Sequence, residues 1–369
     1  MKKKILIGVN GWGRGHSTRC AVIGQQLLEL GYEVKFLTDF QGYDYLSQRY
    51  DTSQLVKVRS YRPITIGESV NVLVNVLAAA FFKFVQLPLI ARKTMSFIRD
   101  WQPDLIITDA ELVTGKLVKK LQIPSIYLSS ISYLNYCQLP FELSFTQRIY
   151  VRLFNWGLSD CTSASLIIIS KMSQLQLREG VANNVHLLDI FLRKELEQNS
   201  WNPQGTHLLV YLRGTYIKRI LKELEIVGKQ LQRKVFVYGI EDRKDTEYLT
   251  FKPISDQHFM MDMLTADYVI NTSGNQLIGE LAYIGVPALL LPEIDQFEQH
   301  INSILADDFY DNMTRGDLKT IKAPEIIAQL RTLKGKPHPH LKANAGKAVA
   351  LITAYIEGIG SDSKPCEEA

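Results

Sequence analysis

ILIGVNGWGRGHSTR, residues 5–19, is a short apolar run followed by three alternating glycines and then a histidine. An apolar run of this length bounded by glycines is typical of a buried parallel strand. Ser17 can cap the next segment, TRCAVIGQQLLEL, whose apolar residues suit one face of a helix, and Gly31 can end that helix. EVKFLTD then reads as a second strand, so this region predicts a strand–helix–strand unit.

The same alternation continues along the chain. Strands are predicted at residues 103–109, 124–129 and 165–170, and after a stretch of charged and turn residues the pattern restarts in THLLVYL, KVFVYGI, DYVIN and PALLLP. Strands that alternate with helices imply a parallel sheet covered on both faces. The sequence therefore predicts an α/β fold with two Rossmann-like doubly wound domains that face an interdomain cleft.

The boundaries of the domains follow from this pattern, and a chain of 369 residues is too long for one ordinary core. We expect an N-terminal domain, a linker, a C-terminal domain, a last helix that packs back towards the N-terminal domain, and a disordered tail. These segments are residues 1–190, 191–206, 207–337, 338–360 and 361–369.

Composition and charge narrow the class of protein. The content of 46% hydrophobic and 22% charged residues is ordinary for a globular protein, and the net charge of +4 is spread along the chain, which argues against a nucleic-acid partner. The four cysteines form no C-x-x-C pair, so we expect no zinc or redox site and free, mostly buried thiols in a reducing cytoplasm. The first apolar run is too short for a signal-peptide core.

Two apolar stretches raise the question of a membrane. Residues 70–90 approach the length of a membrane span, but polar residues interrupt them, so we expect one or two amphipathic helices that are largely buried. A face that rests on a membrane surface is the alternative. Residues 133–156 are rich in aromatic side chains, most of which we expect in the core, although such rings also stack on sugars or accommodate lipid chains.

The glycine loop after the first strand allows two interpretations. Gly11, Gly13 and Gly15 suggest a dinucleotide fingerprint, and Asp39 lies where a ribose-binding acid would sit, but the third glycine comes one residue early and His16 takes its expected place. A histidine at the mouth of a cleft can instead act as a general base.

A base histidine needs a partner that orients its ring, and Asp109 is the candidate. Asp109 ends another predicted parallel strand, so it should reach the same edge of the sheet as His16. The simpler alternative is that His16 caps a helix and Asp109 ends a strand. Because the two predicted strand ends converge, we favour a pair of base and orienting residue.

The second informative stretch is NTSGNQLIGELAYIGVPALLLPEIDQFEQHIN, residues 271–302. A strand ends in TSGN and a helix follows, which makes a ready site for a diphosphate at a helix N-terminus. Glu280 lies in that helix among apolar neighbours, and a ribose diol offers it hydroxyl donors. The loop after LLLP is dense in carboxylates and amides, which suit sugar hydroxyls, although a solvated surface loop explains the same polarity.

These motifs resemble the GT-B glycosyltransferases, and they are most similar to the MurG-like and UDP-glucuronosyltransferase-like group, in an uncharacterised prokaryotic branch with GxGRGHxxR near the N-terminus. The resemblance covers nearly the whole chain and rests on GWGRGHSTR, PDLIITD, YLRGT and the motif that ends in GELAYIGVPALLLPEIDQFEQHIN. It implies an acceptor-binding N-terminal domain and a nucleotide-sugar-binding C-terminal domain.

By position, the resemblance implies roles for individual residues. His16 corresponds to the general base and Asp109 to its partner. The diphosphate turn is Ser273, Gly274 and Asn275, and Glu280 holds the ribose. Glu298 and Gln299 read the donor sugar, with Asn302 on the same helix; Gly214 and Thr215 belong to a second phosphate loop, and residues 251–255 face the base. Thr272, Asn275 and Gln276 depart from plant-type relatives, so plant-type small-molecule glucosylation is not implied.

The implied reaction is inverting and metal-independent transfer of a sugar from a nucleotide diphosphate sugar, by resemblance a UDP-sugar, to an acceptor hydroxyl. No D-x-D triplet occurs, which agrees with a reaction without a metal, and we expect no cofactor. We expect a cytoplasmic enzyme with a lipid-linked or amphiphilic acceptor and contact with the cytoplasmic face of a membrane. A non-hydrolysing sugar-nucleotide epimerase and a non-catalytic nucleotide-sugar-binding protein remain as alternatives.

Overall fold

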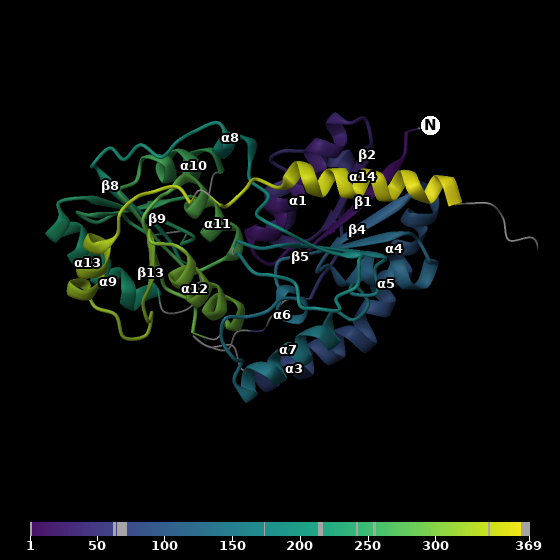
Figure 1. Ribbon diagram of the computed structural model, residues 1–369, viewed down its shortest axis with the longest axis horizontal. Helices are drawn as coiled ribbons and strands as arrows, with labels where there is room; N and C mark the ends of the chain where they lie inside the picture. The colour runs from purple at the N-terminus through teal and green to yellow at the C-terminus, as the bar shows by residue number, and fades with distance from the viewer. Residues whose placement is uncertain are drawn as a thin grey trace, which may run out of the picture.

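The computed structural model describes residues 2–61, 64, 72–172, 174–212, 217–240, 243–253, 256–294, 296–338 and 340–362. The chain forms two α/β domains that lie side by side, with α11 and α12 of the second domain on the side that faces the first (Figure 1). The two sheets contain seven and six strands, and each pairing within them is parallel.

The N-terminal sheet has the strand order β3-β2-β1-β4-β5-β6-β7. Its inner strands are buried on both faces, as their continuous apolar runs predict. Its strands are β1 Lys4–Val9, β2 Glu33–Thr38, β3 Leu55–Lys57, β4 Leu105–Asp109, β5 Ser125–Ser129, β6 Leu166–Ser170 and β7 Val185–Leu188.

The helices of this half include a π-helical segment between α3 and α4. They are α1 Arg14–Glu29, α2 Phe40–Leu46, η1 Thr52–Gln54, α3 Val72–Phe81, η2 Phe82–Gln86, α4 Leu87–Trp101, α5 Leu112–Leu121, α6 Tyr133–Tyr136 and α7 Phe145–Gly157. The short helix α8, Lys194–Glu197, lies in the connection to the second sheet.

The C-terminal sheet repeats the arrangement with the order β10-β9-β8-β11-β12-β13. Its strands are β8 His207–Tyr211, β9 Lys234–Tyr238, β10 Leu249–Lys252, β11 Tyr268–Asn271, β12 Ala288–Leu290 and β13 Met313–Arg315. The helices that follow α8 are α9 Ile217–Leu231, α10 Asp256–Thr265, α11 Asn275–Ile284, α12 Phe297–Phe309, α13 Ala323–Thr332 and α14 Ala345–Asp362.

Each sheet has one point where the strand order reverses direction along the chain. In the N-terminal sheet this point lies between β1 and β4, and in the C-terminal sheet between β8 and β11. Ligands of open α/β sheets bind outside the carboxyl ends of the strands at such a switch point. The glycine loop follows β1, Asp109 ends β4 and the turn before α11 follows β11, so most predicted site residues lie at these two points.

The cores show how the domains are joined. One apolar cluster combines buried residues of both halves, including Tyr133 and Ile190 from the first and Ile278 and Ala282 from the second. Helix α14 returns over the N-terminal domain and packs beside α1 (Figure 1), with Ile352 in the same cluster as β1. The last helix begins and ends a few residues later than predicted, and most of the predicted tail lies outside the described residues.

The prediction that residues 70–90 are largely buried is wrong. Leu77, Phe81, Phe84 and Leu89 are each more than half exposed, because α3 and α4 pack on the domain with one side only. Within the described part of the chain, the stretch Val74–Trp101 is long and apolar enough to cross a membrane by length and composition, which by itself is weak evidence.

The core interpretation of the aromatic stretch holds for four of its seven rings, because Tyr133 lies in the core and Tyr136, Phe141 and Phe154 pack against it. Tyr133 is buried, whereas Phe145 and Trp156 are exposed and the remaining four rings are half-buried; these are Tyr136, Phe141, Tyr150 and Phe154. Helix α7 contains no buried residue. The thiols of Cys20, Cys137 and Cys161 are free and buried as expected, and Cys366 lies outside the described residues.

Candidate functional site

The glycine loop is shaped by close backbone approach. A Cβ at Gly11 would lie 2.2 Å from the carbonyl oxygen of Asp39, so only glycine fits beside the end of β2. Gly13 is the N-cap of α1 with φ 87° and ψ 146°, a conformation that side chains with a Cβ rarely adopt. The loop therefore brings α1 out of β1 with its first turn at the edge of the sheet, and places His16 in that turn.

His16 and Asp109 meet as the strand ends predict. His16 Nδ1 lies 2.8 Å from Asp109 Oδ1, and the ring is partly exposed while the carboxylate is fully buried. The same nitrogen also lies 2.8 Å from Arg19 Nη2, so whether Nδ1 donates to the carboxylate or accepts from the guanidinium depends on the tautomer. The tautomer with the proton on Nδ1 donates to Asp109 and leaves Nε2 able to act as a general base.

Arg19 is the member of this cluster that the sequence interpretation missed. Its guanidinium binds both oxygens of Asp109, with Nε 2.6 Å from Oδ2 and Nη2 2.5 Å from Oδ1, and its side chain is buried. Arg19 lies three residues after His16, so both side chains share one face of α1. The sequence did contain a signal for Arg19, because it lies three residues after His16 and on the same helix face, which was predicted to meet Asp109.

The charges of this cluster compensate one another. Burial raises the pKa of the Asp109 carboxyl. The charges of Arg19 and His16 lower that pKa by more than burial raises it, and the resulting pKa is about 2. Asp109 is thus ionised at neutral pH, and its charge is already neutralised by Arg19. A carboxylate compensated in this way can remain buried beside the imidazole and orient its ring.

The predicted diphosphate turn opens α11. Ser273 adopts a left-handed conformation with φ 63°, and its amide donates to Asn271 Oδ1 over 2.7 Å, so this amide is not offered to a ligand. The hydroxyl of Ser273 and the side-chain nitrogen of Asn271 are buried and have no hydrogen-bond partner among the described residues. A Cβ at Gly274 would meet open space, and no side chain caps the first turn of α11.

The two helix N-termini face each other across the domain boundary. A Cβ at Gly15 would lie 3.6 Å from Cβ of Gln276, so the first turns of α1 and α11 are in contact. His16 therefore lies at the boundary between the domains, next to the turn predicted to hold the diphosphate.

Asn275 contacts the N-terminal domain. Its side chain accepts from the Met172 amide and donates to the Ser170 carbonyl oxygen, so it joins α11 to the end of β6. The role predicted for Asn275 in the diphosphate turn involves its backbone, whereas the side chain serves the domain boundary.

Glu280 has a different partner from the predicted one. Its two oxygens accept from Arg193 Nε over 3.1 Å and Nη2 over 2.7 Å, and one of them also accepts from Gln276. The pair is buried. The sequence pattern indicated a partner for a buried glutamate, and in this structure that partner is the guanidinium of the linker rather than an open ribose site. The ribose role stays a prediction that this geometry does not support.

The side chains of α12 lie in three different settings. Glu298 Oε1 accepts from Ser130 Oγ over 3.4 Å and faces the N-terminal domain. Gln299 forms two hydrogen bonds with Glu293 in its own loop. Asn302 is fully buried and accepts from Lys171. The predicted sugar-reading pair is thus split, with Glu298 at the gap between the domains and Gln299 bracing the loop.

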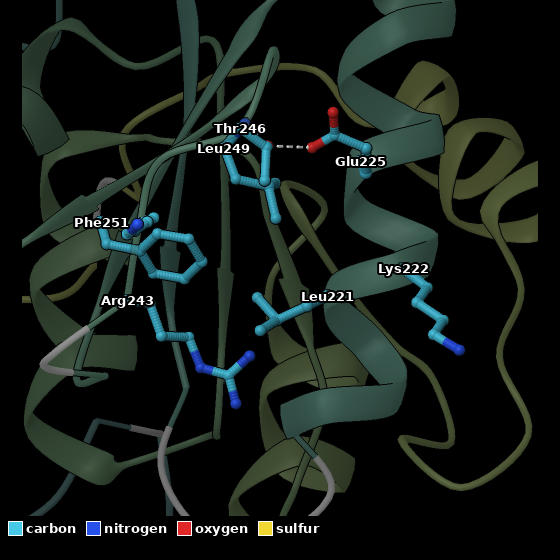
Figure 2. Close-up of a pocket in the computed structure, with 8 residues that line it drawn as sticks. Leu221, Lys222, Glu225, Arg243, Thr246, Leu249 and Phe251 are labelled. Carbon is cyan, nitrogen blue, oxygen red and sulfur yellow. Dashed lines mark hydrogen bonds between the residues drawn. The ribbon is translucent and has the colours of Figure 1, made fainter.

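Two further predicted elements are only partly described. Gly214 and Thr215 lie outside the described residues, as do positions 254 and 255 of the predicted base-facing segment. Phe251, which begins that segment, lines a hollow of about 770 Å³ between α9 and the edge strand β10 (Figure 2). Leu221 and Arg243 point into the same hollow, which contains none of the predicted catalytic or diphosphate residues.

A metal site would need several ligating side chains close together. Within the part of the chain that the structure describes, no three His, Cys, Asp or Glu side chains gather closely enough to hold a metal ion. Independence of a metal stays a prediction.

The pair of parallel sheets, each with a switch point at the domain boundary, is typical of the GT-B fold of glycosyltransferases. The chain belongs to the family described as Glycosyl transferase family 1, whose sequence profile matches residues 3–329. The predicted enzyme class and the MurG-like resemblance are both confirmed.

Relatives and solved structures agree with this membership. A UDP-N-acetylglucosamine--N-acetylmuramyl-(pentapeptide) pyrophosphoryl-undecaprenol N-acetylglucosamine transferase of Rickettsia massiliae is 26% identical, over 83% of this chain and 85% of the relative. The glycotransferase of kitacinnamycin is similar in structure with TM-score 0.67 and 15% identity, over 96% and 100% of the two chains. Acinetobacter baumannii MurG gives TM-score 0.52 and 14% identity, over 95% and 99%.

Proposed function

We propose that this enzyme transfers a sugar from a nucleoside diphosphate sugar, with UDP as the favoured nucleotide, to an acceptor hydroxyl by an inverting and metal-independent displacement. The observation that carries the proposal is the contact of His16 Nδ1 with the buried Asp109 carboxylate, in a helix turn that touches the first turn of α11. A base and a diphosphate-binding turn then lie on opposite sides of one gap.

The proposed step is one displacement. With Nδ1–H donated to Asp109, His16 Nε2 takes the proton of the acceptor hydroxyl, and the acceptor oxygen forms a bond to the anomeric carbon. The bond from that carbon to the diphosphate oxygen breaks, and the nucleoside diphosphate leaves with the electron pair. Attack from the face opposite the leaving group inverts the anomeric centre.

The leaving group needs stabilisation that the first turn of α11 can supply. An uncapped helix N-terminus offers amide donors and the positive end of the helix dipole, both of which favour a developing diphosphate charge. The favoured nucleotide is supported by the curated relative above, which is named for a UDP-N-acetylglucosamine donor.

A donor and acceptor array read by mass spectrometry tests the proposal. Thermal unfolding with UDP, GDP and TDP identifies the nucleotide first, because a ligand that binds the folded state raises the melting temperature. We expect UDP to give the largest shift, and turnover to persist in EDTA with inversion at the anomeric carbon. The absence of a shift with all three nucleotides, or retention of configuration, contradicts the proposal.

The acceptor that we propose is lipid-linked or amphiphilic and is met at the cytoplasmic face of a membrane. Helices α3 and α7 lie side by side at one edge of the N-terminal domain (Figure 1), and α3 continues through η2 into α4. The Phe84 ring of η2 is 5.8 Å from the Trp156 ring of α7. We call their exposed apolar residues the apolar face: Leu77, Phe81, Phe84, Val85, Leu89, Phe145, Ile149, Leu153 and Trp156.

The charge of these helices suits an anionic surface. Together α3, η2, α4 and α7 contain one acidic residue, Asp100, and six basic residues: Lys83, Arg92, Lys93, Arg99, Arg148 and Arg152. Apolar side chains flanked by basic ones bind membrane interfaces through both burial and electrostatic attraction. The relative from Rickettsia massiliae is named for an undecaprenol-linked acceptor, which is in line with this acceptor class.

Co-sedimentation with vesicles tests the membrane contact. We expect binding to anionic vesicles at low salt, reduced at high salt, and lost in a Leu77→Ser/Phe84→Ser variant. Ile226→Ser is the matched control, because Ile226 is an exposed apolar residue of the other domain. Failure to bind anionic vesicles at low salt, or equal loss in the control, contradicts the membrane contact.

A further inference from the structure

Lys171 is a buried lysine at the boundary between the domains. It directly follows β6, its side chain is fully buried, and Nζ lies 2.5 Å from Asn302 Oδ1 on α12. The ammonium also lies 3.9 Å from the centre of the Tyr133 ring. Lys171 therefore belongs to the N-terminal domain, and its side-chain nitrogen binds a residue of the C-terminal domain.

The side chain of Asn302 binds both Lys171 and the turn predicted to hold the diphosphate. Its other side-chain atom, Nδ2, donates to the Ser273 carbonyl oxygen over 3.1 Å. Ser273 has a left-handed backbone that is unfavourable for a residue with a side chain, and its amide is fixed by Asn271. The turn is thus held from two sides, by Asn271 of its own strand and by a relay that starts in the other domain.

The surroundings of Lys171 give no ordinary reason for a charge. Tyr133 and Cys137 face it from α6 and its end, and Glu298 and Asn302 face it from α12, but it forms no ion pair among the described residues. Burial lowers its pKa to about 7, which Glu298 and Cys137 only partly offset. A buried lysine is costly, and an apolar residue of similar length would fill the space more favourably.

We propose that Lys171 is a positioning residue, which acts through Asn302 to hold the Ser273–Gly274 turn in its donor-binding conformation when the two domains are docked. The inference rests on the proposed function, because it assigns the turn to the donor diphosphate. Lys171 makes the shape of the donor site depend on the other domain, and by linkage donor binding stabilises the docking of the domains.

Three variants and one control test the relay. Lys171→Met removes the charge and the hydrogen bond but keeps the length of the side chain, and Asn302→Leu removes the middle of the relay. The double variant combines the two. Asn312→Leu is the matched control, because Asn312 is also a buried asparagine of this domain that donates to a backbone carbonyl, that of Val286.

The readout is the dissociation constant of UDP by titration calorimetry, together with kcat and KM for the donor that the array identifies. We expect about tenfold weaker UDP binding for each single variant, the effect of one hydrogen bond that involves a charge. The double variant is also about tenfold weaker, because the two residues act in series. KM for the donor rises with the dissociation constant, kcat changes much less, and Asn312→Leu stays within about twofold of the wild type.

The outcomes separate the relay from the proposed function. If the wild type binds none of UDP, GDP and TDP, the proposed function and the relay both fail. If the wild type binds and Lys171→Met binds equally well, or if the losses add to about a hundredfold in the double variant, the relay alone is overturned. Should Lys171→Met not fold, the comparison of Asn302→Leu with Asn312→Leu decides, since equal affinities in that pair overturn the relay.

Discussion

Two buried pairs of arginine and carboxylate lie near the boundary between the domains, and they differ in where their partners come from. Arg19 and Asp109 belong to the same sheet and its first helix, and their contacts are 2.5 and 2.6 Å. Arg193 lies in the linker and Glu280 in α11, with contacts of 2.7 and 3.1 Å. Both members of the first pair belong to the N-terminal domain. The second pair forms only where the linker packs on the C-terminal domain.

This difference extends to the residues around each pair. His16 is oriented by a neighbour from its own domain, at the switch point of its own sheet. On the other side, Asn275, Glu298 and Asn302 each contact a residue of the N-terminal domain. The proposed catalytic half of the site is therefore assembled by folding of one domain, and the proposed donor half is completed by docking of two.

Loss of the first pair is the largest effect that we expect. Arg19→Met leaves Asp109 as an uncompensated buried charge, which costs about 3–5 kcal/mol of unfolding free energy. Urea denaturation measures it, and Arg219→Met is the control, because the hydrogen bonds of Arg219 to the described residues go to backbone carbonyls, those of Leu318 and Ile321. A loss for Arg19→Met no larger than that of the control contradicts the charge-compensation role.

The second pair sharpens the comparison because it joins the domains. Arg193→Met isolates the Glu280 carboxylate and is expected to cost about 3 kcal/mol, whereas Arg193→Met/Glu280→Met removes both charges and recovers most of that loss. The measurement is urea denaturation followed by fluorescence, with small-angle scattering to detect loosened domains. Equal losses in the single and double variants would show that the pair does not act as a charge pair.

Acid titration gives the smallest of these effects. The pKa of Asp109 is about 2 in the folded protein against 3.8 ordinarily, so the unfolded state binds its proton at the higher pH. Asp109 therefore contributes about 2 kcal/mol above pH 4, and this contribution is lost as the pH falls towards 2. The stability advantage of the wild type over Asp109→Asn should shrink in that window, and a constant advantage from pH 6 to pH 2 would rule out the lowered pKa.

The fold was readable from the sequence where strands are buried on both faces. β1, β4, β5 and β6 were predicted within two residues of their bounds, because central parallel strands are continuous apolar runs. The strands β3, β7, β10 and β13 were missed. They lie at or beside the sheet edges, are three or four residues long and are only partly buried, so they lack that pattern.

The site was readable where one domain supplies all of it. His16 and Asp109 follow adjacent strands, and parallel strand ends meet at one edge of a sheet, which is why the pair could be predicted. Lys171 and Arg193 were missed because their partners are more than eighty residues away in the other domain, and no local spacing records how two domains dock.

The most direct test of the account compares turnover and nucleotide affinity in His16→Ala. Because the base belongs to the N-terminal domain alone, we predict that kcat falls about a hundredfold or more while the dissociation constant of UDP stays within about twofold of the wild type. Wild-type turnover in this variant, or a loss of UDP affinity that parallels the loss of turnover, would contradict the separation of a catalytic half from a donor half.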